Sequence, residues 1–287
     1  MLKHSSLFAV LLFMSSCTFA STADLNLTQK NQGTALSDTS SGSWYFSWGY
    51  NKDYWSNSDI HISQPGLNNK FTVYDVSAGD FPGWNTGIFN KDLMSPQYNI
   101  RIGHFINRAH TWGVELSFDH TKYNTDLNQN ATLAGVVNGQ LVTQNSTLTK
   151  NYFYYALHNG ANELMLNLVR REPLIDLPRA NMQLVAIGKV GAGVMVPHPE
   201  NTIFGQQSDV GPKAWGNYFG WNHGWWQLGG WTAGVEVGGQ LVFHKRVYLE
   251  LTDKEAYTNL SGIQVYQGSA SQAMWLNEVI LSLGAII

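Results

Sequence analysis

The sequence predicts an all-β fold, a closed antiparallel transmembrane β-barrel of about eight strands with long extracellular loops. Three observations predict it: segments in which apolar and polar residues alternate, connections that alternate between long and short, and no later apolar run long enough for a membrane helix. Successive side chains of a strand point to opposite faces, so each segment has one apolar and one polar face. Such a sheet fits lipid on one side and a wet or ion-paired interior on the other.

Eight segments show this alternation. In chain order their apolar faces are Trp44, Phe46, Trp48 and Tyr50; Ile100, Ile102 and Ile106; Trp112, Val114, Leu116 and Phe118; Leu164, Leu166 and Leu168; Met182, Leu184, Ala186, Val190 and Val194; Trp231, Ala233, Val235, Val237, Leu241 and Phe243; Val247, Leu249 and Leu251; and Trp275, Val279, Leu281, Leu283, Ala285 and Ile287. The sixth and seventh segments form the longest ribbon, joined by the tight turn His244-Lys245-Arg246.

The connections between these segments differ in length. Short turns are expected at Asn107–His110, Pro173–Pro178 and His244–Arg246, and long connections at about 51–97, 124–150 and 198–228, with a further loop at Tyr257–Ala270. Long loops on one side and short turns on the other are typical of outer-membrane barrels. Within the second long connection, Asn138-Gly139 between short apolar runs predicts a type I′ hairpin.

One segment leaves the number of strands open between eight and ten. Tyr152–Leu157 is either a separate strand, with a partner in Phe71–Ser77, or an extension of the strand that begins at Glu163.

The first twenty residues predict a secretory signal peptide. Met1–His4 is a short basic region and Ser5–Met14 an apolar run too short to span a membrane as a helix. Small residues at Thr18 and Ala20 favour cleavage after Ala20, although a cut after Ala23 also fits. The expected organisation is therefore a signal peptide at 1–20, a flexible polar leader at 21–42 and the barrel at 43–287.

Cys17 is the one cysteine of the chain. Because it directly follows Met14-Ser15-Ser16, it partly resembles the lipidated cysteine of a lipoprotein signal, which leaves a second processing route open. No disulfide can form within one chain, so stability has to come from a closed hydrogen-bonded fold or a large core. A net charge of −3 gives no basic surface, and no nucleic-acid partner is expected.

The polar faces place charged residues of both signs inside the predicted barrel. These residues are Arg101, Glu115, Asp119, Asn167, Lys189, Glu236, Glu250, Lys254 and Glu278. Side chains fill the interior of an eight-stranded barrel, and unpaired charges in so narrow a space are costly. The sequence therefore predicts a plug of ion pairs, with a transport path or a binding cavity as the alternative.

Aromatic residues gather near the ends of the predicted strands, where Tyr and Trp form girdles at the membrane surfaces. The segment Trp215–Trp226 holds more rings than anchoring requires, namely Trp215, Tyr218, Phe219, Trp221, Trp225 and Trp226. Anchoring is the default role of such rings, and an exposed aromatic surface for a sugar or a lipid is the alternative for this segment.

Catalytic and metal-binding signals are weak. His61 and Ser63 share one face of a strand near Asp59, as a hydrolase would need, but such a pair in a polar loop is an ordinary occurrence. His198 and Glu200 have no third ligand nearby. No catalytic, cofactor or metal residue is predicted.

The signal peptide, the alternating strands and a last strand that runs to Ile287 resemble the small outer-membrane β-barrels, the class of the OmpA transmembrane domain, OmpX and OmpW. The resemblance covers about 43–287 and lies in architecture, because no diagnostic motif is present and the chain ends on Ile287 where members often end on an aromatic residue. It implies an outer membrane of a Gram-negative bacterium, with membrane lipid, lipopolysaccharide and the barrel assembly machinery as partners.

Lipid A deacylases and lipid A palmitoyltransferases share this architecture. The deacylase signature His-x-Ser-Asn is absent, since Gln64 follows Ser63, and no catalytic residues are transferred. The leading hypothesis is a structural or surface-binding outer-membrane protein that acts through its aromatic-rich loops. The alternatives are a lipid A-modifying enzyme, a narrow pore for small apolar compounds and a soluble periplasmic β-sandwich.

Overall fold

The computed structural model describes residues 42–83, 96–208, 219–220 and 226–287. The predicted signal peptide, its Cys17, almost all of the leader and most of the Trp215–Trp226 segment lie outside the described residues. In the described residues, no helix combines the length and the apolar character needed to cross a membrane.

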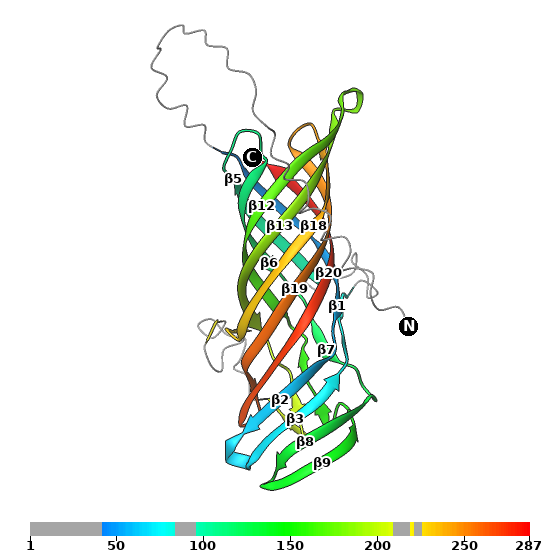
Figure 1. Cartoon of the computed structure of the whole chain (residues 1–287), viewed down its shortest axis with the longest axis vertical. Helices are drawn as coiled ribbons and strands as arrows, with labels where there is room; N and C mark the ends of the chain where they lie inside the picture. The colour runs from blue at the N-terminus through cyan, green and yellow to red at the C-terminus, as the bar shows by residue number, and fades with distance from the viewer. Residues whose placement is uncertain (1–41, 84–95, 209–218, 221–225) are drawn as a thin grey trace, which may run out of the picture. The chain divides into compact units, whose positions relative to one another are not determined.

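Eight long strands form most of one antiparallel sheet (Figure 1). In their order in the sheet they are β1 (Trp44–Trp55), β5 (Tyr98–Phe105), β6 (Trp112–Asp119), β12 (Ala161–Leu177), β13 (Met182–Pro197), β18 (Gly230–Phe243), β19 (Val247–Val265) and β20 (Gly268–Ile286). The order returns to its start, because β20 also pairs with β1 from Tyr45↔Ile286 to Trp55↔Leu276. We call the side toward which these strands turn their buried side chains the interior.

Further strands form a cap beyond one end of the long strands (Figure 1). β2 (Ser58–Gln64), β3 (Asn69–Val76), β8 (Asn130–Val137) and β9 (Gln140–Thr147) continue the sheet from the first residues of β20. Two small sheets complete the cap: β4 (Ala78–Gly79), β7 (Tyr123–Thr125) and β11 (Ala156–Leu157) in one, and β10 (Phe153–Tyr154), β14 (Thr202–Ile203) and β15 (Gln206–Gln207) in the other.

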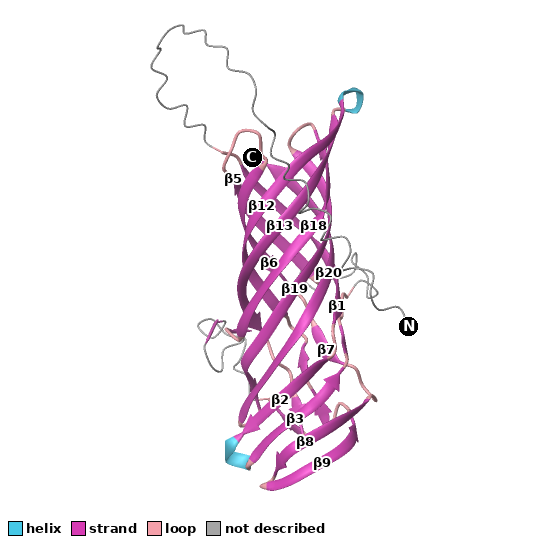
Figure 2. Cartoon of the chain, in the orientation of Figure 1, coloured by secondary structure: helices cyan, strands magenta, loops and turns pink. Residues whose placement is uncertain are grey.

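The remaining elements are short (Figure 2). Single 3-10 turns occur at η1 (Pro65–Leu67) and η4 (Pro178–Ala180), and β16 (Phe219–Gly220) pairs in parallel with β17 (Trp226–Gln227). The connections 106–111, 178–181 and 244–246 all lie at the end where β1 begins and β20 finishes, which we call the short-turn end.

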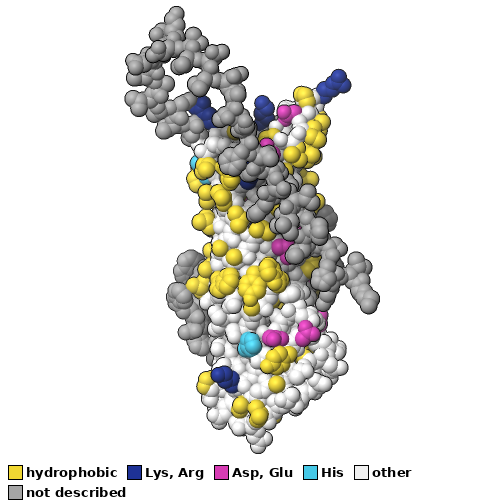
Figure 3. Space-filling view, in the orientation of Figure 1, with side chains coloured by type: hydrophobic (Ala, Val, Ile, Leu, Met, Phe, Trp, Pro, Cys, Tyr) yellow, Lys and Arg dark blue, Asp and Glu magenta, His cyan; other side chains and the backbone are white. Residues whose placement is uncertain are grey.

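The predicted alternation is confirmed in all eight long strands. Along β20, for example, Leu283 is 60% exposed while its neighbour Ser282 is 2% exposed. Hydrophobic side chains gather on the visible face of the long strands, whereas fewer of them appear on the visible face of the cap (Figure 3). The type I′ hairpin is also confirmed, because Asn138 and Gly139 both have positive φ between β8 and β9.

Three expectations about connections are wrong. The connection 51–97 holds the end of β1 and the strands β2 to β4, and Tyr257–Ala270 holds the β19–β20 hairpin. The apolar residues of these strands point into the core of the cap. A prediction that looks for one lipid-facing side per strand therefore does not find these strands. Pro173 lies within β12, at a bulge where β12 has already passed the start of β6 and pairs on one side alone. A proline is tolerated there because no ladder hydrogen bond is lost.

The proposed pairing between Tyr152–Leu157 and Phe71–Ser77 is wrong as well. Phe153 and Tyr154 pair with Thr202–Ile203, and Ala156 and Leu157 pair with β7, so this segment belongs to the small sheets of the cap. Residues 71–76 lie in β3 between β2 and β8.

Two apolar clusters lie at opposite ends of the long strands. The larger one fills the cap, with Ile60, Val73, Leu133 and Leu157 all completely buried. The smaller one lies at the short-turn end and consists of Tyr45, Phe105, Val185, Val242, Tyr248 and Ile286. In it, Tyr45 and Tyr248 cover the glycines with which they pair on the neighbouring strands, Gly103 and Gly284.

We expect the Gly284→Ala variant to be less stable by about 1–3 kcal/mol, because an added Cβ would lie 2.2 Å from Cζ of Tyr248 and push the ring out of the cluster. The measurement is urea unfolding of the protein in lipid vesicles, followed by tryptophan fluorescence.

Gly188→Ala is the matched control, because nothing lies within 4 Å of the corresponding Cβ. Its free energy of unfolding should stay within about 1 kcal/mol of that of the parent protein. Equal stability of the two variants would contradict the assigned packing of Tyr248.

Candidate functional site

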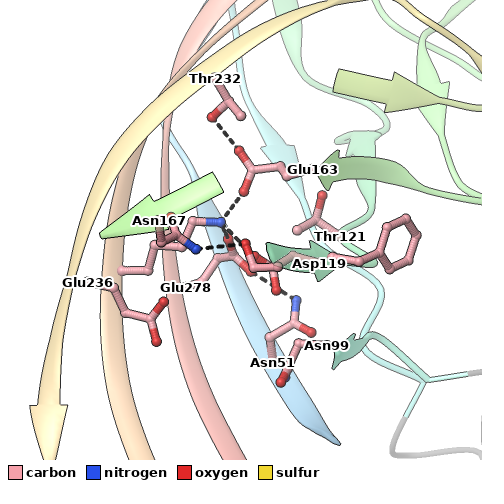
Figure 4. A network of polar contacts seen from close by, with 12 residues as sticks. Asn51, Asn99, Asp119, Thr121, Glu163, Asn167, Thr232, Glu236 and Glu278 are labelled. Carbon is pink, nitrogen blue, oxygen red and sulfur yellow. Dashed lines mark hydrogen bonds and ion pairs between the residues drawn. The ribbon is translucent and has the colours of Figure 1, made fainter. Parts of the chain in front are cut away.

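Three of the cations buried in the interior of the long strands form one network of ion pairs, and the first is Lys254. Its Nζ lies 2.8 Å from Oδ2 of Asp119 and 2.5 Å from Oε1 of Glu278, and it also pairs with Glu163. Oε1 of Glu163 accepts a hydrogen bond from the hydroxyl of Thr232 at 2.5 Å. Figure 4 shows the three carboxylates converging from different strands.

Arg101 and Lys189 continue this network toward the short-turn end. Nζ of Lys189 lies 3.0 to 3.2 Å from oxygens of Glu115, Glu236 and Glu250. Arg101 pairs with Asp119 and lies within 3.8 Å of oxygens of both Glu115 and Glu236. Glu115 and Glu236 therefore bridge Lys189 to Arg101, and Asp119 bridges Arg101 to Lys254.

All nine residues predicted for the interior are buried there. The predicted ion-paired plug is thus present in the structure, with three cations that each contact three carboxylates. Glu163 completes the plug and was missing from the predicted set. Its side chain lies on the strand face opposite to that of its neighbour Leu164, so the alternation alone would have found it.

Asp119, Glu163 and Glu278 are also the one group of at least three possible metal ligands among the described residues, with their oxygens within 4.8 Å of one another. The ammonium group of Lys254 lies between them and contacts all three. The lysine thus occupies the position between the three carboxylates that a metal ion would take.

Apolar side chains close both ends of this polar interior. The cap cluster lies at one end and the smaller cluster with Tyr45, Phe105 and Tyr248 at the other. The hollow beside Lys189 and Lys254 measures about 10 Å³, roughly the minimum for one water molecule. The arrangement is that of a filled interior.

A cleft of about 410 Å³ opens on the cap. Its lining contains no charged residue and combines amides, aliphatic groups and two rings: Gln64, Asn69, Asn138, Gln144, Gln206, Leu67, Val137, Val142, Ile203, Tyr152 and Phe204. The rings of Tyr152 and Phe204 lie 5.4 Å apart. Amides that give and accept hydrogen bonds beside flat rings suit an uncharged polar ligand with an apolar face.

Phe204 holds an unusual backbone conformation. It follows β14 as the first residue of the two-residue turn Phe204-Gly205, and its φ of 49° lies in the left-handed region. Asn, Asp or Gly is the usual residue there, and a bulky one costs about 1–3 kcal/mol. Contacts with Phe71, at a centroid distance of 5.1 Å, and with Tyr152 hold the ring at the cleft.

His61 and Asp59 of the weak hydrolase pattern have hydrogen-bond partners outside that pattern. The His61 ring is hydrogen-bonded through Nδ1 to Oγ1 of Thr72 at 2.8 Å, and Oδ1 of Asp59 accepts a hydrogen bond from the backbone N–H of Asp75. Thr72 thus holds the position next to His61 that a nucleophile would need. Ser63 is paired through its backbone with Lys70 and Ser269.

His198 and Glu200 do come together in the cap. Nε2 of His198 lies 3.5 Å from Oε1 of Glu200, which also accepts a hydrogen bond from Asn159. These contacts with His198 lower the pKa of Glu200 below its usual value. They bind the 198–200 segment to the turn at Asn159, and they supply two ligands at most for a metal.

Sequence reasoning also missed two residues that line cavities: Phe204 in the cleft on the cap, and Arg171 in a cavity at the short-turn end. Arg171 continues the inward series Glu163, Met165, Asn167 and Val169, so the alternation contained the signal, but Pro173 suggested that the strand had ended. For Phe204 no local signal exists, because phenylalanine does not predict a left-handed turn.

No protein-family model matches the chain. No curated protein matches either. Two solved structures of Ail, the attachment invasion locus protein of Yersinia pestis, are similar: the first, in complex with the heparin analogue sucrose octasulfate, has 13% identity and a TM-score of 0.29, with 86% of this chain and 99% of Ail covered. The second has 12% identity and a TM-score of 0.28 at the same coverage.

The outer membrane protein OprG of Pseudomonas aeruginosa is similar with 11% identity and a TM-score of 0.33, and the match covers 85% of this chain and 96% of OprG. Identities and TM-scores this low assign neither function nor location to the chain. The all-β fold rests on its own strand pairing.

We expect Lys254→Ala to destabilise the fold by about 3–5 kcal/mol in calcium-free buffer, because three buried carboxylates lose their shared cation. Refolding the variant in vesicles with Ca²⁺ should recover part of this loss, since carboxylate oxygens are the ligands that Ca²⁺ prefers. Urea unfolding curves with Ca²⁺ and with EDTA measure both effects.

Lys150→Ala, at an exposed lysine of the cap, is the control and should leave stability unchanged with or without Ca²⁺. If Lys254→Ala unfolds at the same urea concentration as the parent protein, the network does not hold the interior together.

Proposed function

We propose that the chain is an integral outer-membrane protein in which the eight long strands form a closed transmembrane barrel. One observation carries the proposal: large apolar side chains face outward while charged ones face inward. The outward residues with at least half of their surface exposed include Leu166, Val190, Leu251, Leu281 and Leu283. Only an apolar surrounding makes such a surface favourable, and pairing of β20 with β1 supports it by satisfying the edge hydrogen bonds that lipid cannot.

We further propose a structural and surface-binding role instead of transport. The filled interior and the apolar clusters at both of its ends favour this role over a pore. The short-turn end would face the periplasm and the cap the outside of the cell, as in barrels with short periplasmic turns and long extracellular connections. Membrane lipid and lipopolysaccharide would then surround the outward face.

The cleft on the cap is the proposed binding surface. Its lining of amides and rings favours an uncharged oligosaccharide, whose hydroxyl groups match the amides and whose apolar ring faces match Tyr152 and Phe204. The strained turn at Phe204 supports a binding site at this cleft, because strain of this kind gathers at ligand sites.

The membrane part of the proposal predicts that the protein from an extracted outer-membrane fraction migrates differently on a gel before and after boiling. A closed barrel resists detergent until heat unfolds it, because each strand is hydrogen-bonded on both sides. Recovery in the soluble periplasmic fraction with one mobility would refute a transmembrane barrel. Steady conductance in planar bilayers would refute the filled interior and favour a narrow pore.

The binding part predicts that Phe204→Asn lowers affinity for an uncharged oligosaccharide at least 10-fold while stability stays within about 1 kcal/mol or rises. Asparagine relieves the left-handed strain but lacks the ring that the cleft presents. An array of uncharged oligosaccharides with sulfated ones as charged comparators identifies the probe, and titration of that probe measures affinity.

Tyr74→Ala is the matched control, because Tyr74 is an exposed tyrosine of β3 that does not line the cleft. It should bind the probe as the parent protein does. Equal affinity of Phe204→Asn and the parent would place the ligand elsewhere, and no binding to any uncharged oligosaccharide would refute the ligand class.

A further inference from the structure

A cavity of about 650 Å³ lies at the short-turn end, at the opposite end of the long strands from the cap. Its walls come from the connection 106–111, the β12–β13 hairpin, the 244–246 turn and the last residues of β20. The backbone N–H of Arg171 donates to the carbonyl of Thr111 at 2.8 Å, which fixes β12 against the first of these connections. The volume is within the range of small-molecule sites.

The lining of this cavity is cationic. Arg108, Arg171 and Lys245 contribute positive charges, and Asp176 contributes the one carboxylate side chain of the lining. Oδ1 of Asp176 accepts a hydrogen bond from Gln183 at 2.7 Å. Burial and the neighbouring charge of Arg171 lower the pKa of His110, so its ring is neutral near pH 7. In Figure 3, Lys and Arg side chains gather around this end of the visible face.

Arg171 differs from the other cations on the interior side of the long strands. It is 5% exposed, and its guanidinium donates from Nε to Oε1 of Gln240 at 2.7 Å and from Nη1 to the carbonyl of His110 at 3.1 Å. Both acceptors are neutral. Its Cζ lies 5.0 Å from the centre of the Phe105 ring.

No carboxylate of the described residues forms an ion pair with Arg171, whereas Lys254, Arg101 and Lys189 each contact three. Arg171 is connected to a carboxylate through Gln240, whose amide accepts from Arg171 and donates to Oε2 of Glu250. A buried guanidinium without a counter-ion is costly, and an anion in the cavity that it lines would remove this cost.

The remaining lining is apolar. Val185, Val242 and Ile286 belong both to the cavity wall and to the apolar cluster at the short-turn end, and Met182 and Pro173 extend this wall. A bare inorganic anion would leave the apolar wall uncovered. We propose that this cavity binds an amphipathic anion, a carboxylate with a short apolar body, with the carboxylate at Arg171 and the body against Val185, Val242 and Ile286.

The test is equilibrium dialysis of radiolabelled octanoate against the full mature protein in lipid nanodiscs, with empty nanodiscs to subtract uptake by lipid. We expect saturable binding of one octanoate per chain. Arg171→Gln should weaken it at least 10-fold because the counter-ion is lost, and Lys245→Gln about 3-fold because this lysine lies in an exposed turn. Unlabelled octanol and inorganic phosphate should compete poorly. Octanol has the apolar body without the negative charge, and phosphate has the charge without the body.

Arg179→Gln is the matched control, because Arg179 lies in the turn η4 at the same end but does not line the cavity. It should bind octanoate as the parent protein does. Uptake equal to that of empty nanodiscs would overturn the proposal. So would an octanoate affinity equal to that of the parent protein in both Lys245→Gln and a folded Arg171→Gln. Displacement by phosphate at concentrations similar to those of octanoate would overturn its amphipathic class.

Discussion

The sharing of three buried cations among six carboxylates is the interaction on which the rest of the fold depends. Lys254, Arg101 and Lys189 are each held by carboxylates from more than one strand. Buried ion pairs add little net stability, but breaking one is costly. A register shift of one residue would turn every charge of a strand outward and every outward leucine inward. The network therefore specifies register more than it contributes energy.

Such a network requires that water be kept away from its ends. The two apolar clusters at the ends of the long strands exclude this water. Without the cap cluster around Ile60 and Leu133, Lys254 and its carboxylates would lie near an open end. Tyr45, Phe105 and Tyr248 perform the same task at the short-turn end, and glycines on neighbouring strands leave room for two of these rings. The cap is thus part of the structural solution as well as the location of the proposed binding surface.

The sequence predicted the part of the fold that depends on the two-residue period. All eight long strands, their outward faces and the nine interior residues follow from alternation, which is a local property. Apart from the β8–β9 hairpin, the cap could not be predicted in this way, because β2 pairs with the distant β20 and β3 with the distant β8. These strands also bury the face that the lipid rule assigns to the outside. At the sites, Arg171 was hidden by an in-strand proline and Phe204 by a turn that ordinary propensities assign to asparagine or glycine.

The order of charges along the interior argues that the two proposed sites serve binding and not passage. An anion that enters at the short-turn end reaches Arg171, with which no carboxylate of the described residues forms an ion pair. Beyond it lie the apolar cluster and then Glu250, Glu115 and Glu236, where carboxylates outnumber the cations they share. The anion is therefore attracted at the rim and repelled further in, while the cleft on the cap is uncharged. On this proposal each end binds its own ligand, and the ion-paired interior lies between the two sites.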